Sequence, residues 1–132
     1  LEELTSEYLA ELSDGRFTLN FAVNNDKLNV EVTDHGKIID ILALSSGELA
    51  RVNTATLLAI RKLMNSLSSS QINVLFLDEV MTVLDETGKE KLVEVLLEEN
   101  LNTYLVNHGW SHPLLEKIEV IKDPRNISRL VA

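Results

Sequence analysis

The apolar positions in the first quarter of the chain change from a helical period to a strand period. Over residues 1–13 they recur three and four positions apart between glutamates, as in an amphipathic helix. After an Asp-Gly pair at 14–15, apolar and polar residues alternate over 17–23 and again over 28–32, as in half-buried strands. The Asn-Asn-Asp cluster at 24–26 is a turn signal. The pattern predicts a helix followed by an antiparallel hairpin.

From Gly47 onward the helical period returns. It predicts a helix of about five turns that ends at a serine-rich loop over 66–70. The side chains expected to face inward are Leu49, Val52, Thr56, Ile60, Leu63 and Leu67. The helix at 1–13 has no capping residue before it, so the pattern fits both a short core helix and the stub of a longer helix or coiled coil.

Two further apolar runs, at 72–77 and 103–107, are typical of strands buried on both faces of a parallel sheet. A helix is expected between them over 88–99. Its expected inward side chains are Leu92, Val93, Leu96 and Leu97. Strand, helix and strand form a βαβ unit, whose ligands lie beyond the carboxyl ends of the strands.

The last part of the chain is expected to hold one more helix and one more pair of strands. Pro113 is expected to open a short helix, because proline favours the first helical position. The apolar segments 118–121 and 127–131 are expected to pair across a turn at 123–126.

Composition indicates one globular domain or part of one. The chain has 132 residues, 45% of them apolar, and no Cys, which excludes disulfides and thiolate zinc sites. Its 12 Lys and Arg against 21 Asp and Glu give a net charge of −9, which argues against a free-standing nucleic-acid binder, because such proteins need a basic patch. No apolar run approaches the roughly 20 residues that cross a bilayer. We expect no membrane partner and a cytoplasmic protein, or a nuclear one if the source is eukaryotic. Because the chain begins at Leu1, we expect a processed or excised segment.

The strand at 72–77 runs directly into two adjacent acids, Asp78 and Glu79. Successive side chains of a strand point to opposite faces, so one acid can hold a hydrated metal while the other accepts a proton. In nucleotide hydrolases an acid at such a strand end supports Mg²⁺ near the phosphates. The other interpretation of this pair is a strand that simply ends in solvent-facing acids.

The segment Leu44 to Glu48, LSSGE, stands directly before the long helix. Its hydroxyls, its backbone N–H groups and the helix dipole suit an anion such as phosphate. Ordinary helix capping by Ser45 or Ser46 explains the same residues. His108 follows the second apolar run and can exchange a proton or contact a phosphate, or it can be structural.

Other catalytic signals are absent from the sequence. The three His residues, His35, His108 and His112, show no metal-ligand spacing. There is no G-x-S-x-G nucleophile motif, and without Cys there is no Cys-His pair. The single Trp, Trp110, is interpreted as a packing residue.

The order of these motifs resembles the C-terminal lobe of an ABC-type ATPase head. LSSGE matches the signature loop, the strand ending in Asp78-Glu79 matches Walker B, residues 82–85 match the D-loop, and His108 matches the switch histidine. A helix running into DGRF and then a hairpin before the signature is similar to the SMC-like ATPases of DNA double-strand-break repair, of the SbcC type, and to phage recombination exonuclease subunits. The resemblance implies an α/β fold: the C-terminal half of an ABC-type head, with a parallel-sheet βαβ core, an N-terminal hairpin and a coiled-coil stub. It divides the chain into the end of a coiled-coil helix at 1–14 and the lobe at 15–132.

The resemblance also implies a set of roles. ATP and Mg²⁺ would be held between two heads, with Ser45, Ser46, Gly47 and Glu48 of one head at the nucleotide of the other. Asp78 would orient Mg²⁺, Glu79 would be the general base, and His108 would sense the γ-phosphate. Asp85 would couple the two sites. The implied partners are an N-terminal P-loop lobe of the same protein, a second head, a metallo-nuclease subunit, and DNA through the assembled complex.

Three features depart from the family pattern. Ser46 replaces the first Gly of the usual Gly-Gly pair, and the D-loop begins with Met81-Thr82 rather than small residues. Neither Gly-Lys pair, at 36–37 or 88–89, has the spacing of a P-loop. The chain is therefore expected to be an ATPase only when a P-loop lobe completes it, and to be inactive alone. The alternatives are an SMC or RecF-like DNA-maintenance head, and a non-catalytic acidic interaction domain.

Overall fold

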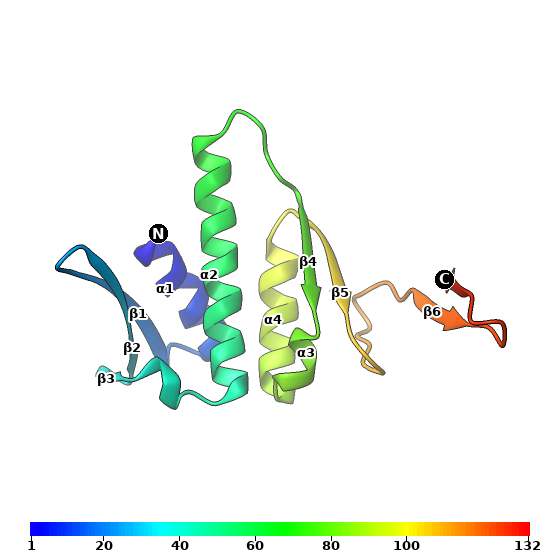
Figure 1. Ribbon diagram of the computed structural model, residues 1–132, viewed down its shortest axis with the longest axis horizontal. Coiled ribbons are helices and arrows are strands. Elements are labelled where there is room, and N and C mark those ends of the chain that lie inside the picture. The colour runs from blue at the N-terminus through cyan, green and yellow to red at the C-terminus, as the bar shows by residue number, and fades with distance from the viewer.

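The computed structural model describes residues 1–132, which form four α-helices and three small sheets. Figure 1 shows how they are arranged. The helices are α1 (Glu2–Ser13), α2 (Ser46–Leu67), α3 (Val80–Val83) and α4 (Glu86–Glu98), with a 3₁₀ turn η1 at Ile41–Ala43. The strands are β1 (Phe17–Asn24), β2 (Lys27–Asp34), β3 (Lys37–Ile39), β4 (Val74–Asp78), β5 (Asn102–Val106), β6 (Glu119–Lys122) and β7 (Ser128–Val131).

The predicted N-terminal helix and hairpin are confirmed. Asp14 ends α1 in the left-handed conformation, at φ 52°, and its N–H donates to the Ala10 carbonyl. Strand β1 pairs antiparallel with β2, and Asn24 opposite Lys27 leaves a two-residue turn. Both turn residues have positive φ, 49° and 60°, which Asn and Asp tolerate better than most side chains. Strand β3 then adds to the free edge of β2.

Helix α2 packs against α1 through a face that overlaps the predicted one only in part, since Val52 is buried as predicted and Thr56 and Leu63 are half-buried. The buried side chains of α2 are Val52, Thr54, Ala55, Leu58 and Ala59. Of the six predicted inward residues, Leu49, Ile60 and Leu67 are exposed, the last by 81%. Small side chains such as Ala55 and Ala59 let the two helices approach closely, whereas the Leu-rich face of α2 has no layer over it.

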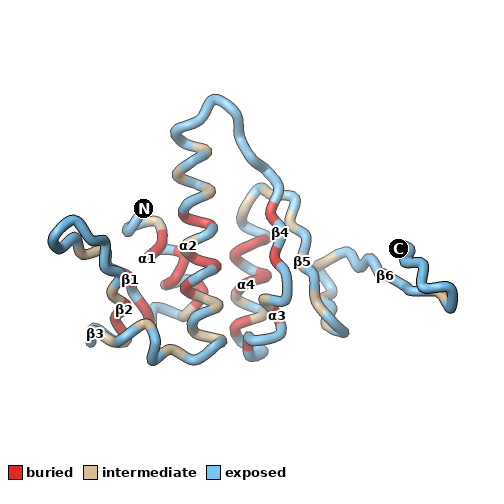
Figure 2. Tube along the Cα trace, in the orientation of Figure 1, coloured by how far each residue is buried: buried red, intermediate tan, exposed pale blue.

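A buried polar network ties α1, α2 and α4 together. The Tyr8 hydroxyl donates to Glu99 Oε1 at 2.5 Å, and Arg61 donates to Glu99 Oε2 at 2.6 Å. Burial, followed by the hydrogen bond to Glu99, raises the pKa of the Tyr8 phenol far above its usual 10.0. Figure 2 shows that the buried residues gather where these helices meet, while the hairpin tip and the C-terminal segment stay exposed.

The βαβ unit is confirmed, with β4 parallel to β5 and α3 and α4 in the connection. The prediction that both strands are buried on both faces is wrong. Leu75 and Leu77 join the core, but Phe76 is 67% exposed and stacks on Tyr104, which is also exposed, at 5.0 Å between ring centres. Helices cover only one side of this sheet. On α4 the predicted Leu97 is exposed, and Val95 is buried in its place.

The segment after β5 has no helix, so the prediction at Pro113 is wrong. The Leu115 N–H bonds the His112 carbonyl in a single turn, and the chain then enters β6. Strands β6 and β7 pair antiparallel as predicted, and the Asp123–Asn126 bond closes their turn. Every residue of both strands is exposed. The hairpin extends away from the helices (Figure 1).

One hydrophobic cluster of 18 buried residues unites α1, the base of the β1–β2 hairpin, α2, β4 and α4. Trp110 packs against the edge of this cluster, as expected for a packing residue. None of the helices combines the length and the apolarity needed to cross a bilayer.

Candidate functional site

The LSSGE segment forms a capping box at the start of α2. The Ser45 hydroxyl accepts from the Glu48 N–H at 3.3 Å, and Glu48 Oε2 accepts from the Ser45 N–H at 2.9 Å. Helix capping and anion binding were alternative interpretations of these residues, and the cap is present. It does not exclude an anion, because Ser45 and Ser46 are exposed at the positive end of a 22-residue helix.

Gly47 brings this loop against the end of α3. A Cβ at position 47 would lie 2.7 Å from the Val83 carbonyl oxygen, closer than real side chains come to backbone. Only glycine therefore allows this approach. The contact places the end of α3, and with it the segment 82–85 that resembles a D-loop, beside the start of α2.

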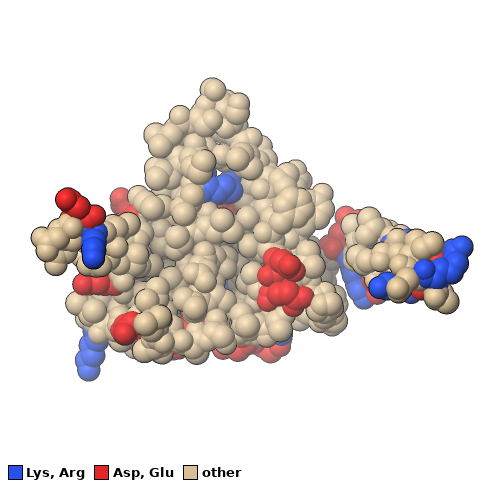
Figure 3. All heavy atoms as spheres, in the orientation of Figure 1, with Lys and Arg blue, Asp and Glu red and all other residues tan.

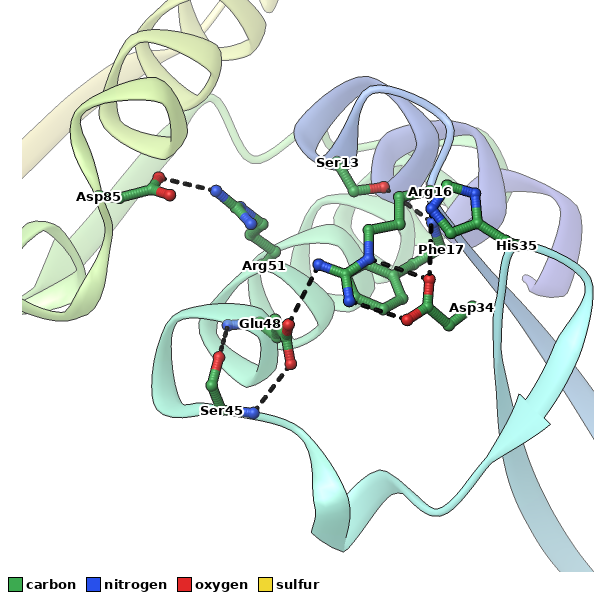
Figure 4. Close-up of polar contacts among 9 residues, drawn as sticks. All are labelled: Ser13, Arg16, Phe17, Asp34, His35, Ser45, Glu48, Arg51 and Asp85. Atoms are coloured by element: carbon green, nitrogen blue, oxygen red, sulfur yellow. Dashed lines mark hydrogen bonds and ion pairs between the residues drawn. The ribbon is translucent and has the colours of Figure 1, made fainter.

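A charged network flanks the loop on its other side (Figure 4). Arg16 donates through Nε and Nη2 to the two carboxylate oxygens of Asp34, at 2.9 and 2.8 Å, and its Nη1 lies 3.3 Å from Glu48 Oε1. The hydrogen bonds from Arg16 hold the pKa of the Asp34 carboxyl below its usual 3.8. His35 lies in the turn after β2, as expected, with its Nε2 3.8 Å from Asp34.

Asp85 caps α4 and at the same time pairs with α2. Its Oδ1 accepts from the Gly88 N–H at 2.7 Å and from Arg51 Nη2 at 2.9 Å. Arg51 is mostly buried, and its Nε has no partner within the chain. The two networks border an open cavity of about 300 Å³, lined by Arg16, Ser45, Ser46, Gly47, Glu48, Arg51, Val83 and Asp85.

The second group of candidate residues lies at the carboxyl ends of β4 and β5. Glu79 Oε1 is 3.0 Å from His108 Nε2, and Glu79 Oε2 accepts from the Thr82 hydroxyl at 2.7 Å. Glu79 has φ 58°, a left-handed conformation unusual for a residue with a side chain, and its N–H bonds the Val106 carbonyl. Its carboxylate and the imidazole are both open to solvent.

Asp78 ends β4 on the same face as the exposed Phe76, as the alternation of the strand requires. Its carboxylate can supply an oxygen ligand to a hard cation such as Mg²⁺. Nowhere in the chain do three His, Asp or Glu side chains gather closely enough to hold a metal ion. A metal at this position therefore needs further ligands from outside these residues.

Helix α3 connects the two groups. Glu79 stands at its N-terminus, Thr82 bonds the Glu79 carboxylate, and Val83 contacts Gly47. The start of α2 and the end of β4 lie at the same end of the molecule (Figure 1). His112, by contrast, is held by Glu90 at 3.1 Å and by the Leu114 N–H, away from both groups.

The sequence-based predictions did not include Arg16, Asp34 or Arg51. Arg16 lies in the DGRF segment on which the resemblance rests, but it was not named there as a site residue, and Asp34 and Arg51 belong to no local motif. The hairpin register offers one signal, because Phe17 opposite Asp34 brings the preceding Arg16 to the same end of the hairpin.

Comparison with known proteins places the chain among proteins of similar sequence and fold. No family model matches the chain. It is 45% identical over 130 residues to "Probable exonuclease subunit 2" of Escherichia phage T5. The alignment covers 98% of this chain and 21% of the phage protein. A structure from a study of ATP-driven dimerization and DNA-stimulated activation of SMC ATPases superimposes with a TM-score of 0.74 at 20% identity, covering 98% of this chain and 81% of that one.

The chain has the fold of the C-terminal lobe of an SMC-like ATPase head. The Smc head of Pyrococcus furiosus, solved with the C-terminal domain of ScpA, agrees, with a TM-score of 0.68 at 19% identity over 98% of this lobe and 33% of that chain. The α/β fold class expected from the resemblance, and the likeness to phage exonuclease subunits, are confirmed. The lobe spans about a fifth of the phage relative, 21% of its length.

Proposed function

We propose that this lobe is half of an SMC-like ATPase head that hydrolyses ATP at a head dimer interface and thereby drives DNA double-strand-break repair or recombination. The proposal rests on the position of α3. This helix contacts both the Ser45–Glu48 loop and the Glu79–His108 pair, so that the two groups lie at one end of the molecule. A nucleotide from a second head would meet the loop, while the pair would serve the nucleotide of its own head.

Each residue has a task that its position supports. The Ser45 hydroxyl and the Gly47 N–H would donate to the γ-phosphate of the opposite head, with Ser46 beside them and Glu48 holding the loop. Asp78 would support the Mg²⁺ that neutralises phosphate charge when it is bound. Glu79 would accept the proton of the attacking water, and His108, 3.0 Å away, would stabilise the γ-phosphate. Asp85 would couple the two sites through Arg51.

An N-terminal P-loop lobe of the same protein is the proposed cover for the open side of the sheet. Phe76, Tyr104 and Val106 are each more than half exposed there. Figure 3 shows a face that is largely free of charged atoms over α2 and β4, although the chain carries a net charge of −9. Apolar surface of this kind marks an interface that another domain covers.

The proposal of further partners is based on the proteins that this chain resembles. The phage T5 protein is named as an exonuclease subunit, and one structural neighbour comes from a study of ATP-driven dimerization and DNA stimulation. We therefore infer a second copy of the head, a metallo-nuclease subunit, and DNA bound by the whole assembly. Helix α1 would be the end of a coiled coil at 1–14, and the location would be cytoplasmic, or nuclear in a eukaryote.

The test is Glu79→Gln in the protein that carries both lobes. We expect ATP to stay bound while turnover falls about 10²–10⁴-fold, the usual share of a positioned base. Glu90→Gln is the matched control, because Glu90 also pairs with a histidine, His112, at nearly the same distance of 3.1 Å. Turnover of Glu79→Gln equal to that of the control would refute the assignment. No turnover in the unmodified protein would refute the ATPase proposal itself.

A further inference from the structure

Arg16 connects three elements that meet at the start of α2. It lies between α1 and β1. Its guanidinium donates hydrogen bonds to Asp34 at the end of β2 and forms an ion pair with Glu48 in the first turn of α2. Figure 4 shows the side chain directed toward both carboxylates at once. A planar guanidinium can donate to two carboxylates in fixed directions, which a lysine ammonium does not do.

Several contacts besides Glu48 hold the backbone and the side chain of Arg16 in place. Its carbonyl accepts the His35 N–H at 3.0 Å, and its guanidinium lies 4.5 Å from the ring centre of Phe17. Phe17 itself is fully buried in the core. The Arg16 side chain is therefore held by the backbone, by an aromatic ring and by Asp34 before it reaches Glu48.

Glu48 divides its two oxygens between Arg16 and the signature loop. Oε1 faces Arg16 at 3.3 Å, and Oε2 accepts the Ser45 N–H at 2.9 Å. Without the first contact, the carboxylate is free to turn away from Ser45, and the loop gains conformations that its partner must suppress on binding. The other nearby cation, Arg51, pairs with Asp85 and makes no contact with the capping box.

We propose that Arg16 is a positioning residue for the head dimer, which acts through Glu48 to hold the Ser45 loop ready for the nucleotide of the opposite head. This inference rests on the proposed function. An exposed, charge-assisted contact changes an equilibrium by about two- to fivefold. Because a two-fold symmetric dimer contains the contact twice, the expected effect on dimerisation is about four- to 25-fold.

The experiment uses the protein that carries both lobes, with Arg16→Ala beside Arg125→Ala. Arg125 is a fair control because it also forks onto an aspartate, Asp123, but in the β6–β7 turn. Fluorescent ATP binding to the open head should be equal in all three proteins. Sedimentation with a slowly hydrolysed ATP analogue should show that Arg16→Ala dimerises at about four- to 25-fold higher protein concentration. Turnover per head at saturating protein concentration should return to the level of the control.

That concentration rescue separates positioning from damage, because a misfolded loop would stay inactive at any concentration. Dimerisation of Arg16→Ala at the control concentration would overturn the inference, and so would a loss of turnover that high concentration does not restore. If unmodified protein neither dimerises with ATP nor hydrolyses it, the proposed function fails instead.

A second variant guards against misfolding of Arg16→Ala. Glu48→Gln keeps an oxygen that can accept the Ser45 N–H, because Gln also forms capping boxes, but it removes the charge that faces Arg16. We expect a weaker shift of dimerisation in the same direction. Combining the two substitutions should add little to Arg16→Ala, because both act on one contact. Fully additive effects would show that Arg16 does not work through Glu48.

Discussion

The two sides of the lobe differ in how far their surfaces are completed within the chain. On the side formed by α1, α2 and the β1–β2 hairpin, Phe17, Leu19 and Leu58 are buried, and the charged groups at the start of α2 are paired. On the β4–β5 sheet, Phe76 and Tyr104 are 67% and 52% exposed, and the β6–β7 hairpin has no buried residue. The side around the Ser45–Glu48 loop is therefore preformed, whereas the sheet side leaves its apolar surface open.

This difference separates the two halves of the proposed chemistry. The capping box already holds the Ser45 loop in shape. The Glu79–His108 pair stands in water, where charges interact weakly and water is not excluded. In the proposed function, covering the open side of the sheet would exclude this water. The proposal therefore implies that the loop is ready to bind a nucleotide before the pair is ready to act in hydrolysis.

The largest expected effect on stability comes from removing a buried side chain on the side that the chain completes by itself. Leu58 is fully buried, so Leu58→Ala should lower the free energy of unfolding by about 2–5 kcal/mol through lost burial and a cavity. The matched change on the open side, Phe76→Ser, should cost less than about 1 kcal/mol in the lobe, because that ring is mostly in water. Urea unfolding followed by circular dichroism measures both.

When the P-loop lobe is joined to this one, the cost of Phe76→Ser in free energy of unfolding should rise above that of Leu58→Ala. The cost of Leu58→Ala itself should not change. If Phe76→Ser costs the same with and without that lobe, the open side is not an interface between lobes.

A smaller effect is expected where the two sides touch. Gly47→Ala places a methyl group 2.7 Å from the Val83 carbonyl, so the backbone must move, at a cost of about 1–3 kcal/mol. Ser46→Ala, one residue earlier and exposed, serves as the control. Thermal unfolding of the two variants compares them. Equal melting temperatures would mean that the contact between the loop and α3 is not tight.

The smallest effect concerns pH, through the phenol that joins α1 to α4. The pKa of Tyr8 is raised in the folded state, so above pH 10.0 the unfolded chain loses this proton first and stability falls as the pH rises. Below that pH, Tyr8→Phe should cost about 0.5–1.5 kcal/mol, the net value of one hydrogen bond. Unfolding curves at pH 8 and at about pH 11 should show the difference between the two proteins shrinking. A difference that stays constant would contradict the raised pKa.

Much of the fold could be predicted from the sequence because period and turn chemistry act locally. Alternation over β1 and β2 and the Asn-Asp turn predicted the hairpin, and the apolar runs predicted the parallel pair. The prediction failed where partners are distant. The apolar content of β4 fits a strand covered on both faces, but this chain covers only one. The Leu-rich face of α2 misled for the same reason, since apolar positions do not reveal which layer covers them.

The sequence predicted the site residues that belong to recognisable motifs and missed those that do not. Ser45, Glu79 and His108 stand out by their place beside a helix start or a strand end, and the structure pairs Glu79 with His108. Arg16 and Arg51 carry no such sign. Their importance depends on partners 34 positions away for Arg51, and on the closure of the hairpin for Arg16, which only the folded chain shows.

The left-handed backbone at Glu79 sets the stability of the fold against the catalytic role that we propose for this residue. A residue with a Cβ pays about 1–2 kcal/mol for that conformation, and glycine pays nothing. Directed evolution for heat resistance alone would therefore discard the glutamate, whereas selection for turnover would keep it. Libraries of the protein that carries both lobes, sorted by the two criteria, should diverge first at this single position.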